Sequence, residues 1–359
     1  MSEIVLMKGN EVIAEAAIRV GCDGYFGYPI TPQSEIMETL MLREPWKETG
    51  MIVLQAESEI AAINMVYGGA SCGKKVMTSS SSPGISLKQE GLSFLCGSQL
   101  PCLVVNVQRG GPGLGTIQPS QADYFQSVKG GGHGDYKLIV LAPNCVQEMN
   151  DFVELGFTLA FKYRNPVMLL ADGVVGQIME KVELSKYKKR WTDDEIEEIS
   201  GDWATTGKKS HRTQNVTSSL DLAAIKQELR NKEIQKKYRQ IEKKEVRFEK
   251  YKCDDIEFLI VAYGSCARIC SKMVDLLREE GVKIGLLRPI TLFPFPVKEI
   301  EKIAQSVKGI LDVEMSASGQ MVEDVKLAVN GKTRVDFYGR SGGVVPTPEE
   351  VYVYFKKKF

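Results

Sequence analysis

An arginine stands at the start of a glycine-rich segment, where it could bind an anion. The segment 106–116 reads NVQRGGPGLGT, so Arg109 follows an apolar run and precedes four glycines. A guanidinium offers planar, two-pronged donors that match a carboxylate, and glycines leave backbone room for a ligand. A lone arginine is more often part of a surface ion pair, so this segment alone leaves both roles open.

A hydroxyl group stands before a helix in the segment GYPITPQSE, residues 27–35. Pro29 and Pro32 stiffen a turn that delivers Thr31 just ahead of the expected helix. A hydroxyl and free backbone N–H groups at a helix start form a corner suited to a carboxylate. The same spacing also fits a plain helix cap, with Thr31 as N-cap and Pro32 as the first helical residue.

Acidic residues open the helix that we expect from Glu57 to Tyr67. The segment QAESEIAA, residues 55–62, follows a strand pattern and places Glu57 and Glu59 in the first turn. The helix dipole favours acids there, which would explain both without any chemistry. If the site is catalytic, only one of the two acids could serve it.

A run of hydroxyls forms the fourth segment, TSSSSPG, residues 78–84. Consecutive hydroxyls between the end of a strand and the start of a helix are hard to explain as packing. We therefore expect a polar lip for a ligand here, including Ser82 and Pro83.

The elements that must position these segments alternate between strand and helix along the first half of the chain. The first helix is expected from Asn10, as its N-cap, to Val20. Such alternation predicts a parallel sheet with helices on both faces, and functional loops lie at the carboxyl ends of its strands. The expected strands are residues 24–28, 51–55, 75–79, 101–108, 137–142 and 166–171.

Composition divides the chain into three parts. Residues 1–180 hold the alternating pattern, and residues 181–255 read as a charged insert followed by a solvated connecting helix, since 16 of the 30 residues from 221 to 250 are charged. Residues 256–359 form a second α/β unit, in which 288–296 is expected to be a turn.

Bulk properties exclude several classes of partner. Lys+Arg and Asp+Glu are both 46, so the net charge gives no reason to expect nucleic acid or an anionic membrane. There is no signal peptide at the N-terminus and no apolar run long enough to span a bilayer, which predicts a cytoplasmic location. The eight cysteines include no C-x-x-C pair and read as small buried hydrophobes in a reducing compartment.

Taken in this order, YPITPQSE, the SE-x-AA helix start and QRGGPGLGT resemble the alpha subunit of 2-oxoacid:ferredoxin oxidoreductases, above all the 2-oxoisovalerate (3-methyl-2-oxobutanoate) branch. YGSCAR, LLRPITLFPFP and the pair Gly319-Gln320 are similar to the transketolase C-terminal domain. The resemblance covers all but the insert at 181–255. It implies an α/β fold, with a pyrimidine-type thiamine-diphosphate-binding domain at 1–180 and a transketolase C-terminal-like domain at 256–359.

The resemblance also implies a reaction and roles for residues. A 2-oxoacid is oxidatively decarboxylated to acyl-CoA and CO2, and ferredoxin is reduced. Glu59, with Glu57 as the alternative, matches the glutamate that hydrogen-bonds N1′ of thiamine diphosphate and makes the 4′ nitrogen a base. Arg109 and Thr31 match the positions that hold the substrate carboxylate. The residues expected beside the cofactor, together with Glu59, are Pro29, Ile30, Ser82 and Pro83.

Further parts of the implied machinery are missing from the sequence. It has no GDG…N motif for Mg²⁺ and diphosphate, and no cysteines spaced for a cluster. The resemblance therefore implies a beta-type subunit with the Mg²⁺–diphosphate site and a ferredoxin-like subunit with [4Fe–4S] clusters, so that this chain is inactive alone. Coenzyme A is the expected co-substrate. Open alternatives are a 2-oxoglutarate enzyme, a non-oxidative thiamine-diphosphate decarboxylase or transketolase component, and a non-catalytic binding protein.

Overall fold

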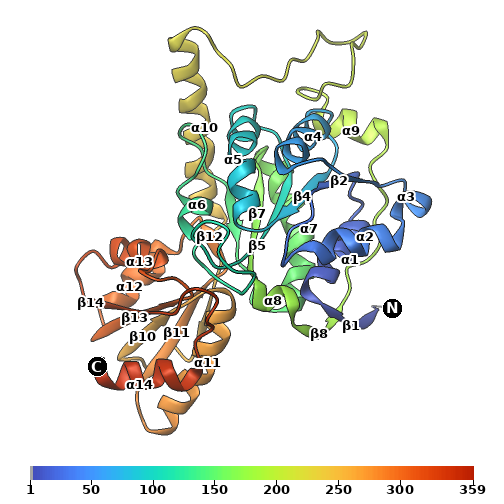
Figure 1. The fold of residues 1–359 in the computed structure, drawn as a ribbon. Coiled ribbons are helices and arrows are strands. Elements are labelled where there is room, and N and C mark those ends of the chain that lie inside the picture. The colour runs from blue at the N-terminus through green and yellow to red at the C-terminus, as the bar shows by residue number, and fades with distance from the viewer. Residues whose placement is uncertain (1–2) are drawn as a thin grey trace.

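A seven-stranded sheet forms the centre of the first part of the chain in the computed structural model, which describes residues 3–359 (Figure 1). Its strand order is β12-β6-β7-β5-β4-β2-β3, and all of its strands except β12 are parallel. The six parallel strands are β2 (Gly24–Gly27), β3 (Ile52–Gln55), β4 (Val76–Ser80), β5 (Leu103–Gln108), β6 (Ile139–Leu141) and β7 (Val167–Asp172). The predicted parallel sheet is thus confirmed.

Helices cover both faces of this sheet, which is why its central strands are apolar throughout. Every residue of β5 and β7 is buried. Helices α1 and α7 pack together, as do α4 and α5. The helices of this part are α1 (Gly9–Arg19), α2 (Ser34–Arg43), α3 (Pro45–Glu48), α4 (Glu59–Ser71), α5 (Pro83–Gly97), α6 (Tyr124–Val128), α7 (Val146–Tyr163) and α8 (Gly173–Gln177).

Two predicted helix caps are wrong. Helix α1 begins at Gly9, so Asn10 lies inside it, where its buried amide donates to the Pro32 carbonyl (2.6 Å) and to Glu35 (2.9 Å). Thr31 is not the cap of α2, because residues 30–33 form a turn in which the Gln33 N–H donates to the Ile30 carbonyl (3.0 Å), and the helix starts at Ser34.

The second part of the chain contains a five-stranded sheet in the order β14-β13-β10-β11-β9. Its strands are β9 (Phe248–Tyr251), β10 (Phe258–Val261), β11 (Ile284–Pro289), β13 (Gly309–Glu314) and β14 (Arg334–Gly339), of which only β9 is antiparallel. Its helices are α11 (Gly264–Glu279), α12 (Val297–Ala304), α13 (Met321–Val329) and α14 (Pro348–Lys358).

The turn predicted at 288–296 is wrong in its middle. Strand β12 (Thr291–Phe293) is buried and pairs antiparallel with β6, so the second part adds an edge strand to the first sheet. Burying its apolar residues stabilises this strand, and Pro294 can follow it directly because the strand lies at an edge of the sheet.

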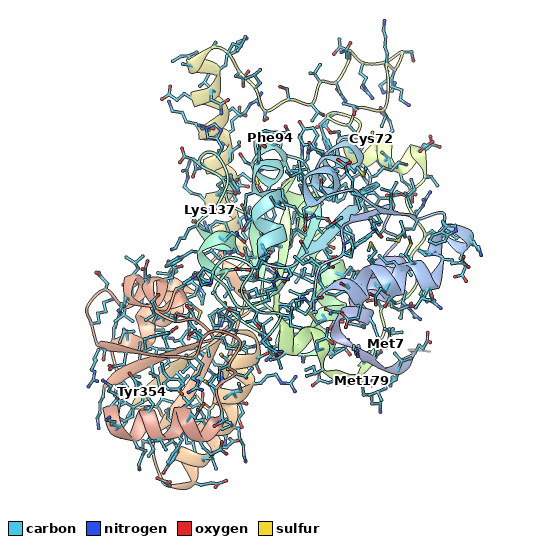
Figure 2. The ribbon with its side chains drawn as sticks, in the orientation of Figure 1. Met7, Cys72, Phe94, Lys137, Met179 and Tyr354 are labelled. Carbon is cyan, nitrogen blue, oxygen red and sulfur yellow. The ribbon has the colours of Figure 1, made fainter. Side chains whose placement is uncertain are left out.

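The charged region contains more structure than its composition indicates. Strand β8 (Met179–Glu183) pairs antiparallel with β1 (Ile4–Lys8), where Met7 and Met179 lie close together in Figure 2. After α9 (Asp193–Ser200), a long loop leads to α10 (Ala224–Lys244), which projects beyond the sheet (Figure 1). Three of its side chains are buried, those of Ile234, Tyr238 and Ile241. No helix within 3–359 has the length and apolarity that crossing a membrane requires.

A buried acid fastens the end of α10 to α7. The Glu245 carboxylate accepts hydrogen bonds from Lys162 (2.6 Å), Tyr163 (2.5 Å) and Arg247 (3.0 Å). Burial by itself would raise the pKa of Glu245, but these hydrogen bonds outweigh it and lower the pKa below its ordinary value of 4.5. A lowered pKa stabilises the fold above that ordinary value, and the stabilisation is lost as the pH falls through the folded-state pKa.

We expect Glu245→Gln to lower the free energy of unfolding by about 2 kcal/mol at neutral pH, because charge-assisted hydrogen bonds are lost. The difference from the unchanged protein should shrink as the pH falls from about 4.5 through the lowered folded-state pKa, where the carboxylate of the folded chain becomes protonated. Urea unfolding at neutral and acidic pH measures both. Glu257→Gln is the control, since its pair with Lys308 is exposed and should change stability little. Equal losses in the two variants would contradict the prediction.

Candidate active site

Arg109 lies directly after β5, at the carboxyl edge of the sheet where β2, β3 and β4 also end. Its Nη1 donates to the Thr31 carbonyl (3.0 Å) and its Nη2 to the Leu114 carbonyl (3.1 Å). Its Nε–H is buried and has no partner, and no carboxylate in residues 3–359 pairs with the guanidinium. The sequence-predicted pair, Arg109 and Thr31, is therefore brought together, and its cation is free to bind an anion.

Ser82 holds the backbone of Arg109 from both sides. Its hydroxyl accepts from the Arg109 N–H (3.0 Å) and approaches the Arg109 carbonyl (3.2 Å) and Asp123 (2.6 Å). Asn106 completes the group, because its side chain accepts from the Ser82 N–H (3.1 Å) and donates to Asp123 (2.9 Å). Burial raises the pKa of Asp123, and the hydrogen bonds from Ser82 and Asn106 oppose that rise. The network fixes the arginine at the strand end.

Glu59 is the first residue of α4 and is only 6% exposed, whereas Glu57 is exposed. Ser58 caps the helix by accepting from the Ala61 N–H (3.1 Å). The carboxylate faces Gly84 in α5, where a Cβ would lie 2.8 Å from Glu59 Oε1 and 2.1 Å from Ser80 Oγ. Glycine at position 84 allows this approach without displacing either side chain.

The run of hydroxyls is mostly buried rather than a lip. Thr78, Ser80 and Ser81 have buried hydroxyls without a partner in the described part of the chain. Ser79 pairs with Tyr25 (2.7 Å) and Gln33 (2.5 Å) beneath the surface. They lie inside because β4 is a central strand.

The other predicted cofactor residues occupy two places. Pro29 is exposed and Ile30 is half-buried, in the loop between β2 and α2. Ser82 and Pro83 line a cavity of about 600 Å³ together with Arg109 and the glycines that follow it. Glu59 does not line this cavity and adjoins it through Gly84, the neighbour of Pro83.

The second part of the chain closes this cavity, to which it contributes Met315, Ser316, Gln320 and Gly342. Gln320 holds the two parts together, since its side chain accepts from the Phe125 N–H (2.7 Å) and donates to the Ala122 carbonyl (2.7 Å). The predicted motif Gly319-Gln320 thus has a structural role at the site.

Two residues of the site were missed from the sequence. Asp123 has no motif around it, and only its position opposite Ser82 and Asn106 reveals it. Lys88 in α5 is fully buried behind Glu59, with Nζ 3.5 Å from the Glu59 carbonyl. Gln89 and Glu90 follow it directly, so the local sequence does not mark this lysine as buried.

Fold and site together define an α/β protein of the thiamine-diphosphate-binding class. Residues 15–246 match the family model "Pyruvate flavodoxin/ferredoxin oxidoreductase, thiamine diP-bdg", and residues 256–351 match "Pyruvate:ferredoxin oxidoreductase core domain II". The chain belongs to the 2-oxoacid:ferredoxin oxidoreductase family, as an alpha-type subunit.

Two relatives agree with this assignment. Ketoisovalerate oxidoreductase subunit VorB of Methanothermobacter marburgensis is 49% identical over 94% of this chain and 93% of its own. The 2-oxoglutarate synthase subunit KorA of Methanocaldococcus jannaschii is 34% identical over 97% and 98%.

Solved structures agree on the fold. A 2-oxoglutarate:ferredoxin oxidoreductase from Magnetococcus marinus, with 2-oxoglutarate, coenzyme A and succinyl-CoA bound, superimposes with a TM-score of 0.85 at 26% identity. The superposition covers 99% of this chain and 65% of the chain of the solved structure. A split-gene transketolase, described as an inactive beta4 tetramer, reaches 0.60 at 12% identity and shares the fold alone, over 98% of this chain and 97% of its own.

The residues present fit part of a thiamine diphosphate site. Gly84 lets α5 come so close that the Glu59 carboxylate takes the place a Cβ would fill, and the buried Arg109 Nε–H has no partner within residues 3–359. A buried carboxylate can accept a hydrogen bond from a heterocyclic nitrogen, and a guanidinium without a carboxylate partner can bind an acid group. Both features are expected where a pyrimidine ring and a 2-oxoacid are held side by side.

Proposed function

We propose that this chain is the alpha-type subunit of a complex that oxidatively decarboxylates 2-oxoisovalerate to an acyl-CoA and CO2 and reduces ferredoxin. The observation that carries the proposal is the Arg109 guanidinium, which has no carboxylate partner within residues 3–359 and is anchored to the Thr31 carbonyl at the edge of a cavity. An arginine without a carboxylate partner, fixed by its own backbone network, is prepared to bind the substrate carboxylate.

Glu59 is the proposed activating acid. When bound, thiamine diphosphate supplies the carbon nucleophile of the reaction. Glu59 binds N1′ of its pyrimidine and holds it in the tautomer whose 4′ nitrogen accepts a proton. The burial of Glu59 and the exposure of Glu57 favour Glu59 for this role, because a carboxylate shielded from water interacts more strongly with its partner.

The charge of the cavity favours a monocarboxylate. Of the described residues that line it, Arg109 is the only cation and Asp123 the only acid. The second carboxylate of 2-oxoglutarate would need another cation to offset its desolvation, whereas a branched apolar group needs none. Of the two relatives described above, the ketoisovalerate oxidoreductase subunit is more similar to this chain (49% identity) than the 2-oxoglutarate synthase subunit (34%).

A partner subunit is proposed to cover the outer face of α4 and α5. Four large apolar side chains are exposed there, Ile60, Met65, Leu87 and Phe94, with Phe94 toward the end of α5 that is far from the second sheet (Figure 2). Exposed large apolar side chains on two helices that pack together indicate an interaction surface. Ile60 adjoins Glu59, so a beta-type subunit docked here would bring Mg²⁺ and the diphosphate grip to the same site. The [4Fe–4S] clusters are proposed to lie on a ferredoxin-like subunit.

An assay of the assembled complex across 2-oxoacids tests the function. With viologen as electron acceptor, we expect reduction that depends on coenzyme A, and a kcat/KM for 3-methyl-2-oxobutanoate about 100-fold above that for 2-oxoglutarate. The isolated chain should show no turnover. Decarboxylation without viologen reduction would instead indicate the non-oxidative alternative, and activity of the single chain would contradict the shared site.

A further inference from the structure

The buried lysine behind the proposed activating acid has no assigned role. Lys88 lies in α5 with its side chain fully buried. It is flanked by Gly84 one turn before it and Gly91 about one turn after it. A Cβ at Gly91 would lie 2.5 Å from Ile63 in α4, just as a Cβ at Gly84 would meet Glu59. The two glycines bring the helices into contact on either side of Lys88, so its side chain is enclosed between them.

The surroundings of this ammonium disfavour its positive charge, except for the negative charge of Glu59. Its Nζ lies at the N-terminal end of α4, where the helix dipole repels a cation. Its single hydrogen bond among residues 3–359 is the long one to the Glu59 carbonyl (3.5 Å), and no carboxylate lies within 4.0 Å of it. Burial lowers the pKa of Lys88 to about 8, and the negative charge of Glu59 opposes that shift.

We propose that Lys88 is a positioning residue for Glu59: its buried ammonium holds the Glu59 carbonyl at the start of α4 and places a positive charge behind the carboxylate. The argument rests on the proposed function, because it assumes that Glu59 acts on thiamine diphosphate. Lys88 belongs to α5 and its side chain is buried behind Glu59, so the cofactor can bind Glu59 without displacing it.

Deuterium exchange at C2 of the bound cofactor tests this role in the assembled complex. The exchange rate reports how well the 4′ nitrogen removes the proton, and acid quenching followed by NMR measures it without substrate turnover. In Lys88→Met we expect the acid midpoint of the rate–pH profile to rise by about one pH unit, with an exchange rate about tenfold lower just below the original midpoint. Lys88→Arg retains the charge and should keep the midpoint close to that of the unchanged complex.

A second buried lysine in the same part of the chain offers a matched control. Lys75 is also buried and also donates to a backbone carbonyl, that of Val20 (3.2 Å), but it lies at the start of β4, away from the carboxyl edge. Lys75→Met should leave the midpoint in place. Equal shifts in Lys75→Met and Lys88→Met would show a general effect of losing a buried cation and would overturn the proposal.

The remaining outcomes separate this proposal from the function on which it rests. An unchanged midpoint in Lys88→Met, with the cofactor still bound, overturns the role of Lys88 and leaves the function intact. Lys88→Gln serves as a second neutral variant, and failure of both neutral variants to assemble would show a folding role instead. If Glu59→Gln leaves C2 exchange unaffected, the proposed function of Glu59 itself fails.

Discussion

Replacing Glu59 with glutamine should reduce kcat of the assembled complex about 100- to 10,000-fold, the usual range for removing an acid–base group. Glutamine keeps the size of the side chain and its place against Gly84, so packing should be retained. It cannot be ionised, and therefore it cannot stabilise a proton on N1′ of the pyrimidine. The measurement is CoA-dependent viologen reduction at saturating 2-oxoacid.

The matched control for this prediction is Glu57→Gln, two residues earlier in the same segment. Glu57 is exposed and begins no helix, since α4 starts at Glu59. We expect its loss to leave kcat within about twofold of the unchanged complex. A large loss in Glu57→Gln with little change in Glu59→Gln would reverse the assignment. Near-equal thermal unfolding of the two variants would show that the comparison concerns chemistry rather than stability.

The choice between these two acids shows what the sequence could not decide. Both lie where the helix dipole favours acids, and spacing alone places them equally well. Only packing separates them, because Glu59 is enclosed by α5 while Glu57 remains in solvent. The neighbours that enclose Glu59, Gly84 and Lys88, are 25 to 29 residues further along the chain, so no local pattern could reveal them.

Elements with strong periodicity were predicted well, and those that depend on distant pairing were not. Strands β5 and β7 are continuous apolar runs, which is the pattern of a buried parallel strand. Strand β12 has only three residues and exists because β6, about 150 positions earlier, offers it an open edge. Asp123 was missed for the same reason, since Ser82 and Asn106 define its role from two other elements.

Replacing Arg109 with methionine should raise KM for the 2-oxoacid and lower kcat/KM about 100-fold, because a charge-assisted, two-pronged contact with the carboxylate is lost. Methionine retains much of the aliphatic length of the side chain. The backbone of residue 109 should stay fixed, since Ser82 binds its N–H rather than its side chain. Steady-state kinetics of the complex with 3-methyl-2-oxobutanoate measure the effect.

Arg109→Lys distinguishes charge from geometry in the same measurement. A lysine keeps the positive charge but cannot reach the Thr31 and Leu114 carbonyls while also offering paired donors to a carboxylate, as a guanidinium does. We therefore expect kcat/KM between those of the unchanged complex and Arg109→Met. Arg268→Met, at an ion pair with Glu180 outside the cavity, is the control and should keep kcat/KM. An unchanged KM in Arg109→Met would contradict the role of this arginine, and the carboxylate would then have to be bound by groups that the partner subunit supplies.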